Sequence, residues 1–189
     1  NSGIVAQSGK ILGIIPKTFI PNYREYYEKR WFASGEDLAK DTIDFLEKDI
    51  PFSPNIIFSH GDFFRFSVEI CEDLWSVIPP SSHHSISGAT VIANLSASNE
   101  IVGKSNYRKD LVKQQSARCV GSYIYSSSAV NESTTDLVYS GHALIASNGS
   151  IDEESERFSH EPQIISSDID CQRLTYTRLS ESQFKDTKN

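Results

Sequence analysis

The residue whose chemistry stands out is Cys71, which follows seven residues of alternating apolar and polar type, 64–70. A thiol at the end of a strand, where the chain turns, is well placed to attack a carbonyl carbon. Glu69, Glu72 and Asp73 lie within two residues of it. Nearby carboxylates raise the pKa of a thiol, so a nucleophilic Cys71 would need a cation to stabilise its thiolate. The alternative is that Cys71 is a small buried hydrophobic residue, the commoner role of a free cysteine.

Lys17 is the candidate for that cation. It follows the apolar segment 11–15 and Pro16, which ends a strand because proline cannot donate a ladder hydrogen bond. An ordinary solvated lysine is the alternative. The two other cysteines are predicted to be structural, since Cys119 lies on the apolar stripe of a predicted helix and Cys171 lies in a polar stretch.

The chain of 189 residues carries 18 Lys+Arg against 25 Asp+Glu, a net charge of −7. Without a clustered basic face we expect no nucleic-acid partner, and without an apolar run of about 20 residues we expect no membrane span. His83 and His84 lie in a Ser/Pro-rich stretch, where we expect surface histidines and no metal site. Three cysteines without a signal segment favour a reducing, cytoplasmic location.

The elements that would position Cys71 and Lys17 follow an α/β pattern. Strands outnumber helices, which favours a layered sandwich over a doubly wound sheet. Apolar spacing of i, i+4, i+7 and i+8 predicts a helix over about 105–121. The first two predicted strands form a hairpin, and so do the two around Ser147-Asn148-Gly149. The predicted strands are 4–6, 11–15, 64–70, 89–95, 122–125, 142–146, 150–151 and 163–166.

Other segments are less regular. Residues 23–32 are predicted to be a short helix or an ordered loop, and residues 34–37 a turn. Pro79-Pro80 is expected to end regular structure. The polar residues 180–189 are expected to be disordered.

Three segments together resemble a known family: GIIPKTFIPNYREYYEKRWF (13–32), VEICEDLW (68–75) and GATVIANLSAS (88–98). They are similar to the carbon–nitrogen hydrolase (nitrilase) superfamily and, within it, to the glutamine amidotransferase (glutaminase) domains of glutamine-dependent NAD+ synthetases. Residues 116–119, 132–138 and 154–158 support the narrower resemblance. The fold that it implies is a nitrilase-type αββα four-layer sandwich, incomplete at the N-terminus.

The resemblance also implies an activity. Cys71 matches the nucleophile of a Glu-Lys-Cys triad, which forms a γ-glutamyl thioester from glutamine and releases ammonia. Lys17 matches the triad lysine, whose ammonium stabilises the thiolate and the oxyanion. Glu28 matches an auxiliary carboxylate near that lysine.

Four positions match residues that bind the glutamine substrate: Tyr23, Glu72, Ser98 and Lys104. A cation at Lys104 suits the substrate α-carboxylate, and Tyr23 and Ser98 can supply hydrogen bonds. Relatives that carry Arg in place of Lys104 would have a bidentate fork that a lysine lacks.

Two parts of the family pattern are missing. The general-base glutamate belongs to a strand before Asn1, and the ATP-dependent synthetase domain would follow the last residue. Because residue 1 is Asn and the chain has no Met, we expect a piece of a longer polypeptide. Residues 1–178 would be the partial hydrolase domain and residues 179–189 a polar tail or linker.

The expected partners are L-glutamine and the synthetase domain of the same polypeptide, and we also expect a homo-oligomer. No cofactor is expected in this part of the chain, whereas ATP, Mg2+ and deamido-NAD+ would bind the synthetase domain. One alternative is a free-standing aliphatic amidase or nitrilase; residues 17–32 and 133–136 favour the synthetase. A second alternative is a degenerate regulatory or oligomerisation domain, against which the presence of both Lys17 and Cys71 argues.

Overall fold

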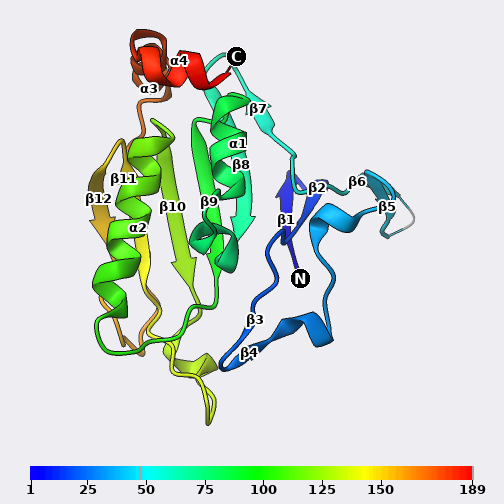
Figure 1. Cartoon of the computed structure of the whole chain (residues 1–189), viewed down its shortest axis with the longest axis vertical. Helices are drawn as coiled ribbons and strands as arrows, with labels where there is room; N and C mark the ends of the chain where they lie inside the picture. The colour runs from blue at the N-terminus through cyan, green and yellow to red at the C-terminus, as the bar shows by residue number, and fades with distance from the viewer. Residues whose placement is uncertain (47, 189) are drawn as a thin grey trace.

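A six-stranded mixed sheet organises the chain, of which the computed structural model describes residues 1–46 and 48–188 (Figure 1). The strand order is β12-β11-β10-β9-β8-β7. The three central strands are parallel: β8 (Phe64–Ile70), β9 (Val91–Ser96) and β10 (Ser122–Ser127). Each outer strand pairs antiparallel with its neighbour: β7 (Phe58–His60), β11 (Ala143–Ser147) and β12 (Ser150–Glu154).

Two helices cover one face of this sheet, α1 (Pro80–Ile86) and α2 (Lys104–Arg118) (Figure 1). The predicted apolar stripe of α2 is confirmed, because Val112, Ser116, Cys119 and Val120 are all buried. The core between the helices and the sheet consists of Leu74, Ile92, Val112, Cys119, Tyr123, Tyr125, Leu144 and Ala146.

A hairpin of β1 (Ser2–Gln7) and β2 (Lys10–Pro16) packs on the other face. Its turn has positive φ at both Ser8 (50°) and Gly9 (74°), as a two-residue hairpin turn requires. A Cβ added at Gly3 would lie 3.1 Å from the side chain of Leu95, so the hairpin lies close against β9. Helices, sheet and hairpin form three successive layers within the described residues, and the predicted α/β fold class is confirmed.

The other elements are short. The extended ones are β3 (Asn22–Tyr23), β4 (Tyr26–Tyr27), β5 (Thr42–Asp44) and β6 (Asp49–Pro51). The 3-10 turns are η1 (Glu28–Arg30), η2 (Gly35–Asp37), η3 (Cys71–Trp75) and η4 (Val130–Glu132). At the C-terminal end lie α3 (Cys171–Ser180) and α4 (Ser182–Lys188). No helix among the described residues is long and apolar enough to cross a membrane.

Three predictions about elements are wrong. Residues 163–166 form no strand, because the segment lies over the exposed face of β10 and β11 with Ile164 95% exposed, and does not join the sheet edge. Pro80 begins a helix, since proline is tolerated in the first turn where its missing N–H has no partner to lose. Residues 182–188 are helical (α4) and not disordered.

The histidine prediction is half correct. His83 is exposed, whereas His84 is buried within α1 and its Nε2 lies 2.9 Å from the carbonyl oxygen of Pro54. The helix places successive residues on different faces, so one histidine enters the core while its neighbour stays in solvent.

Candidate active site

Cys71 lies at the carboxyl end of the central parallel strands, where β8 stops and η3 begins. Its φ is +48°, a left-handed conformation that costs a residue with a side chain about 1–2 kcal/mol. The backbone N–H of Cys71 donates to Oδ1 of Asn94 on the adjacent β9, at 3.1 Å. The turn therefore places a partly exposed cysteine at the carboxyl end of β8, in the manner of a nucleophile on a strained elbow.

The three carboxylates beside Cys71 point in different directions. Glu69 faces α1 on the opposite side of the sheet edge, where it accepts from the N–H of Ser81 (2.8 Å) and from the Tyr123 hydroxyl. Asp73 accepts from two backbone N–H groups. Only Glu72 lines the pocket of Cys71. Strand alternation and the 3-10 turn therefore separate the three side chains, and Glu72 is the one that shares a pocket with the thiol.

Lys17 follows β2 and is almost completely buried, at 1% exposure. Its Nζ donates to Oε2 of Glu28 at 2.9 Å, so the predicted lysine and auxiliary carboxylate form an ion pair. Both line a pocket of about 360 Å³ together with Cys71. The structure thus brings residues 17, 28 and 71 to one cavity, although the chain separates them by up to 54 positions.

A second pocket, of about 440 Å³, also borders Cys71. Cys71 lines this pocket together with all four residues predicted to bind substrate: Tyr23, Glu72, Ser98 and Lys104. Its walls include aromatic and apolar side chains from Tyr26, Trp75, Ile101 and Val102. The cysteine therefore stands where the lysine–glutamate pocket meets the pocket with the polar groups.

The polar groups of the second pocket are oriented by their contacts. The Tyr23 hydroxyl donates to Glu72 at 2.8 Å, and burial raises the pKa of Glu72 while this hydrogen bond lowers it. Lys104 Nζ donates to Oδ1 of Asn99 at 2.6 Å and lies 5.2 Å from the centre of the Trp75 ring. Burial and then the nearby Arg108 lower the pKa of Lys104.

Ser98 differs from these groups because its hydroxyl is buried without a hydrogen-bond partner among the described residues. A buried hydroxyl without a partner costs free energy, which a bound polar ligand would recover. The position of Ser98 at the pocket wall makes it available for that purpose.

Two residues that shape this site, Asn94 and Asn99, were not predicted from the sequence. Asn94 supports the peptide of Cys71, and Asn99 joins Lys104 to Glu25 (2.6 Å) and to Tyr26 (3.0 Å). Their signal in the sequence is an asparagine within, and another just after, an otherwise apolar strand. Such amides are buried only when they are hydrogen-bonded, so both positions could have been identified as polar supports.

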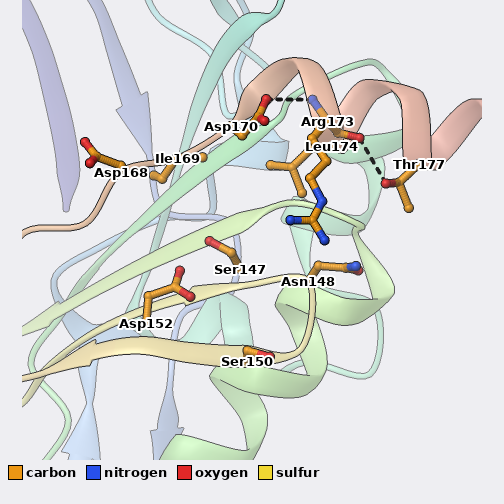
Figure 2. A pocket seen from close by; sticks show the side chains of 10 residues that line it. All are labelled: Ser147, Asn148, Ser150, Asp152, Asp168, Ile169, Asp170, Arg173, Leu174 and Thr177. Atoms are coloured by element: carbon orange, nitrogen blue, oxygen red, sulfur yellow. Dashed lines mark hydrogen bonds between the residues drawn. The ribbon is translucent and has the colours of Figure 1, made fainter.

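A depression far from Cys71 lies between the β11–β12 turn and α3, at the amino ends of the parallel strands (Figure 2). Asp152, Asp168 and Asp170 line it. Asp170 caps α3 by accepting from the N–H of Arg173 at 2.8 Å, which is a structural role. The described residues contain no group of three or more His, Cys, Asp or Glu that could hold a metal ion, here or elsewhere.

The two other thiols lie outside both pockets of Cys71. Cys119 is buried under α2, and this burial raises the pKa of its thiol to about 11. Cys171 opens α3 at the other end of the sheet. Cys71 lines a pocket together with the buried Lys17, so Cys71 is the candidate nucleophile.

Comparison with known proteins bears on the family. No family model matches the chain. It is 38% identical over 190 residues to the glutamine-dependent NAD(+) synthetase of Mycobacterium tuberculosis, in an alignment that covers 100% of this chain and 28% of that protein. The enzyme of the same name from Macaca fascicularis is 32% identical over 171 residues, covering 84% of this chain and 23% of its own length.

Solved structures agree. The glutamine-dependent NAD(+) synthetase of Cytophaga hutchinsonii matches with a TM-score of 0.74 and 30% identity, covering 85% of this chain and 26% of that chain. A carbon–nitrogen hydrolase from Helicobacter pylori, at 17% identity, shares the fold with a TM-score of 0.70 over 98% of this chain and 61% of that chain. The chain spans about a quarter of the length of the synthetases that it matches. The chain therefore belongs to the glutamine-dependent NAD+ synthetase family, of which it represents a part with the nitrilase fold.

Proposed function

We propose that this chain is the glutaminase part of a glutamine-dependent NAD+ synthetase. It would hydrolyse L-glutamine through a cysteine thioester and supply ammonia for the ATP-dependent amidation of deamido-NAD+ to NAD+. The single observation that carries this proposal is that Cys71 lines two pockets, one holding the Lys17–Glu28 pair and the other holding four polar residues suited to an amino acid.

The second pocket supports glutamine as the ligand. A free amino acid presents an ammonium and a carboxylate, and the pocket offers the Glu72 carboxylate for the first and the Lys104 ammonium for the second. The unpartnered hydroxyl of Ser98 adds a hydrogen bond. With the α-ammonium and α-carboxylate of glutamine held in this pocket, its side-chain amide would reach Cys71.

The chemistry then follows in two steps. The Cys71 thiolate attacks the amide carbon, a C–S bond forms, and the carbonyl oxygen becomes an oxyanion beside the Lys17 ammonium. The C–N bond breaks as the leaving nitrogen takes up the proton that the thiol gave up, so ammonia departs and a γ-glutamyl thioester remains. Water then cleaves the C–S bond, releasing glutamate and restoring the thiol.

Glu28 would hold the Lys17 ammonium in place and balance its charge, since the two are paired at 2.9 Å. For the proton transfers we propose the family's general-base glutamate, which the resemblance places before Asn1. General acid–base help of this kind is worth about 10²–10⁴ in rate.

The proposal extends to the rest of the protein. ATP, Mg2+ and deamido-NAD+ would bind a synthetase domain of the same polypeptide, while the glutaminase part needs no cofactor. Three free cysteines suit the reducing cytoplasm. A homo-oligomer is also proposed, which light scattering of the intact protein would test.

The test is the Cys71→Ala variant of the intact protein. It should abolish glutamine-dependent NAD+ synthesis while leaving synthesis from ammonium salts nearly unchanged, and Cys171→Ala should behave like the unmodified protein in both assays. Glutamine-dependent synthesis that survives in Cys71→Ala would refute the proposal. Hydrolysis of simple aliphatic amides without any NAD+ synthesis would instead favour the free-standing amidase.

A further inference from the structure

Asp73 is a buried carboxylate that joins two distant parts of the site. It is 1% exposed, and its oxygens accept from the backbone N–H of Ile70 (2.8 Å) and of Phe19 (2.7 Å). Ile70 immediately precedes Cys71, and Phe19 lies two residues after Lys17. One side chain therefore links the turn of the candidate nucleophile to the segment of the candidate cation.

The bond to Phe19 matters because the other supports of that segment lead away from Cys71. The N–H of Lys17 donates to the carbonyl of Asn1 at 3.0 Å, and the carbonyl of Lys17 accepts from Gly35 at 2.8 Å. Neither contact involves η3 or β8. The Asp73 carboxylate thus provides a direct bridge between the backbone of 17–19 and the backbone of 70–71.

Burial of the Asp73 carboxylate at this position costs free energy. No Lys, Arg or His of the described residues forms an ion pair with it, and burial raises the pKa of Asp73 to about 7. Capping of the 3-10 turn alone would need only the bond to Ile70, which a hydroxyl could accept. The second oxygen is required only for the long-range bond to Phe19.

We propose that Asp73 is a positioning residue that sets the Lys17 ammonium against the Cys71 thiol. Asp73 lines neither pocket, so it acts through these two residues without touching substrate. The proposal deepens the proposed glutaminase function and rests on it. A change at Asp73 should therefore slow the step in which Cys71 is the nucleophile without weakening the binding of glutamine.

The test uses Asp73→Asn in the intact protein. The amide keeps the shape of the carboxylate but turns one oxygen into an N–H donor that faces a backbone donor, so one of the two bonds is lost. We expect kcat for glutamine hydrolysis to fall about 10- to 100-fold, as for a misplaced catalytic group, with KM changed less than about twofold. Asp170→Asn, which alters the cap of α3 at the far end of the sheet, should leave both constants unchanged.

A double-mutant cycle with Lys17→Gln separates positioning from general support of the fold. The readout is the rate of Cys71 alkylation by iodoacetamide across pH, which needs no glutamine. Asp73→Asn should slow alkylation when Lys17 is present, although loss of the Asp73 charge by itself would favour the thiolate, and it should not slow alkylation further in the Lys17→Gln background. Equal effects in both backgrounds, or none in either, would overturn the proposal.

Failure of a variant to fold and failure of the proposed glutaminase function can each be told apart from failure of the positioning role. If Asp73→Asn does not fold, Asp73→Ser replaces it, since a hydroxyl can cap Ile70 but is too short to reach Phe19, and the same coupling is expected. If the unmodified protein hydrolyses no glutamine while the alkylation rates remain coupled, the glutaminase function fails and the positioning role stands.

Discussion

At the scale of single residues, the site depends on a cysteine held in a conformation that side chains rarely adopt. The φ of Cys71 is +48°, and the amide of Asn94 supports its peptide from the next strand. Such strain persists only where surrounding contacts impose it, and it is common at sites of reaction. Asn94 also links the turn to the core, because its Nδ2 donates to the hydroxyl of Tyr123 at 3.1 Å.

This strain predicts an unusual order of stability. Cys71→Gly should be more stable to urea than Cys71→Ala by about 1 kcal/mol, because glycine adopts a positive φ without steric cost. Both variants should lack glutaminase activity. At most helical or extended sites the order would be reversed, so Cys71→Ala being the more stable variant would show that the turn is unstrained in solution.

At the scale of elements, sequence periodicity was sufficient for the parts that position the site. The hairpins, β8, β9 and α2 are predicted because each has a clear period or turn signal and buries the face that its pattern indicates. Two of the three failures, 163–166 and the start of α1, concern segments whose sequence is compatible with more than one structure. An extended apolar segment can cross a sheet face without joining it, and two prolines can begin a helix as well as end one.

Burial of His84 in α1 makes the stability of the fold depend on pH. Burial lowers the pKa of His84 from 6.5 to about 4, so the folded protein binds a proton less readily than the unfolded chain. The stability from this group is therefore full above pH 6.5 and is lost as pH falls from 6.5 to about 4. Between pH 7 and pH 5 it predicts a loss of about 2 kcal/mol in unfolding free energy.

Urea unfolding at the two pH values would measure this loss in the unmodified protein and in His84→Gln, which should lose about 2 kcal/mol less on acidification. His83→Gln is the matched control, because His83 is exposed on the same helix turn and should leave the acid sensitivity intact. An equal pH dependence in the unmodified protein and in His84→Gln would contradict the buried, neutral state of His84.

At the scale of the whole molecule, the site sits at one end of the parallel strands and the C-terminal helices close the other (Figure 1). The candidate residues come from separate segments that meet only in the folded chain. Motif residues such as Lys17, Cys71 and Lys104 could be identified from the sequence because a family pattern contains them. Asn94, Asn99 and Asp73 could not be assigned their contacts, since each depends on a partner from another segment.

Arg178 of α3 connects the C-terminal helices to the segments that precede β9 and β10. Its guanidinium donates to the carbonyls of Val120 (3.0 Å), Cys119 (2.8 Å) and Ala89 (2.6 Å), and it lies 4.9 Å from the centre of the Phe184 ring of α4. The domain boundary at residue 178 remains a prediction, but α3 runs across this position.

Arg178→Met should therefore lower the unfolding free energy by about 2–3 kcal/mol, because several buried carbonyls lose a charged donor. The exposed Arg173→Met on the same helix should change it by less than about 0.5 kcal/mol. Denaturant unfolding measures both. A similar small loss in the two variants would mean that α3 and α4 contribute little to the stability of the domain.

The role of Cys71 as the nucleophile is tested most directly by covalent labelling of the intact protein with a diazo-ketone analogue of glutamine, followed by peptide mass spectrometry. We expect one label, on Cys71, at a rate that excess glutamine reduces, and none on Cys119 or Cys171. Label on either other cysteine, or glutamine hydrolysis that continues at full rate once Cys71 is labelled, would contradict this role.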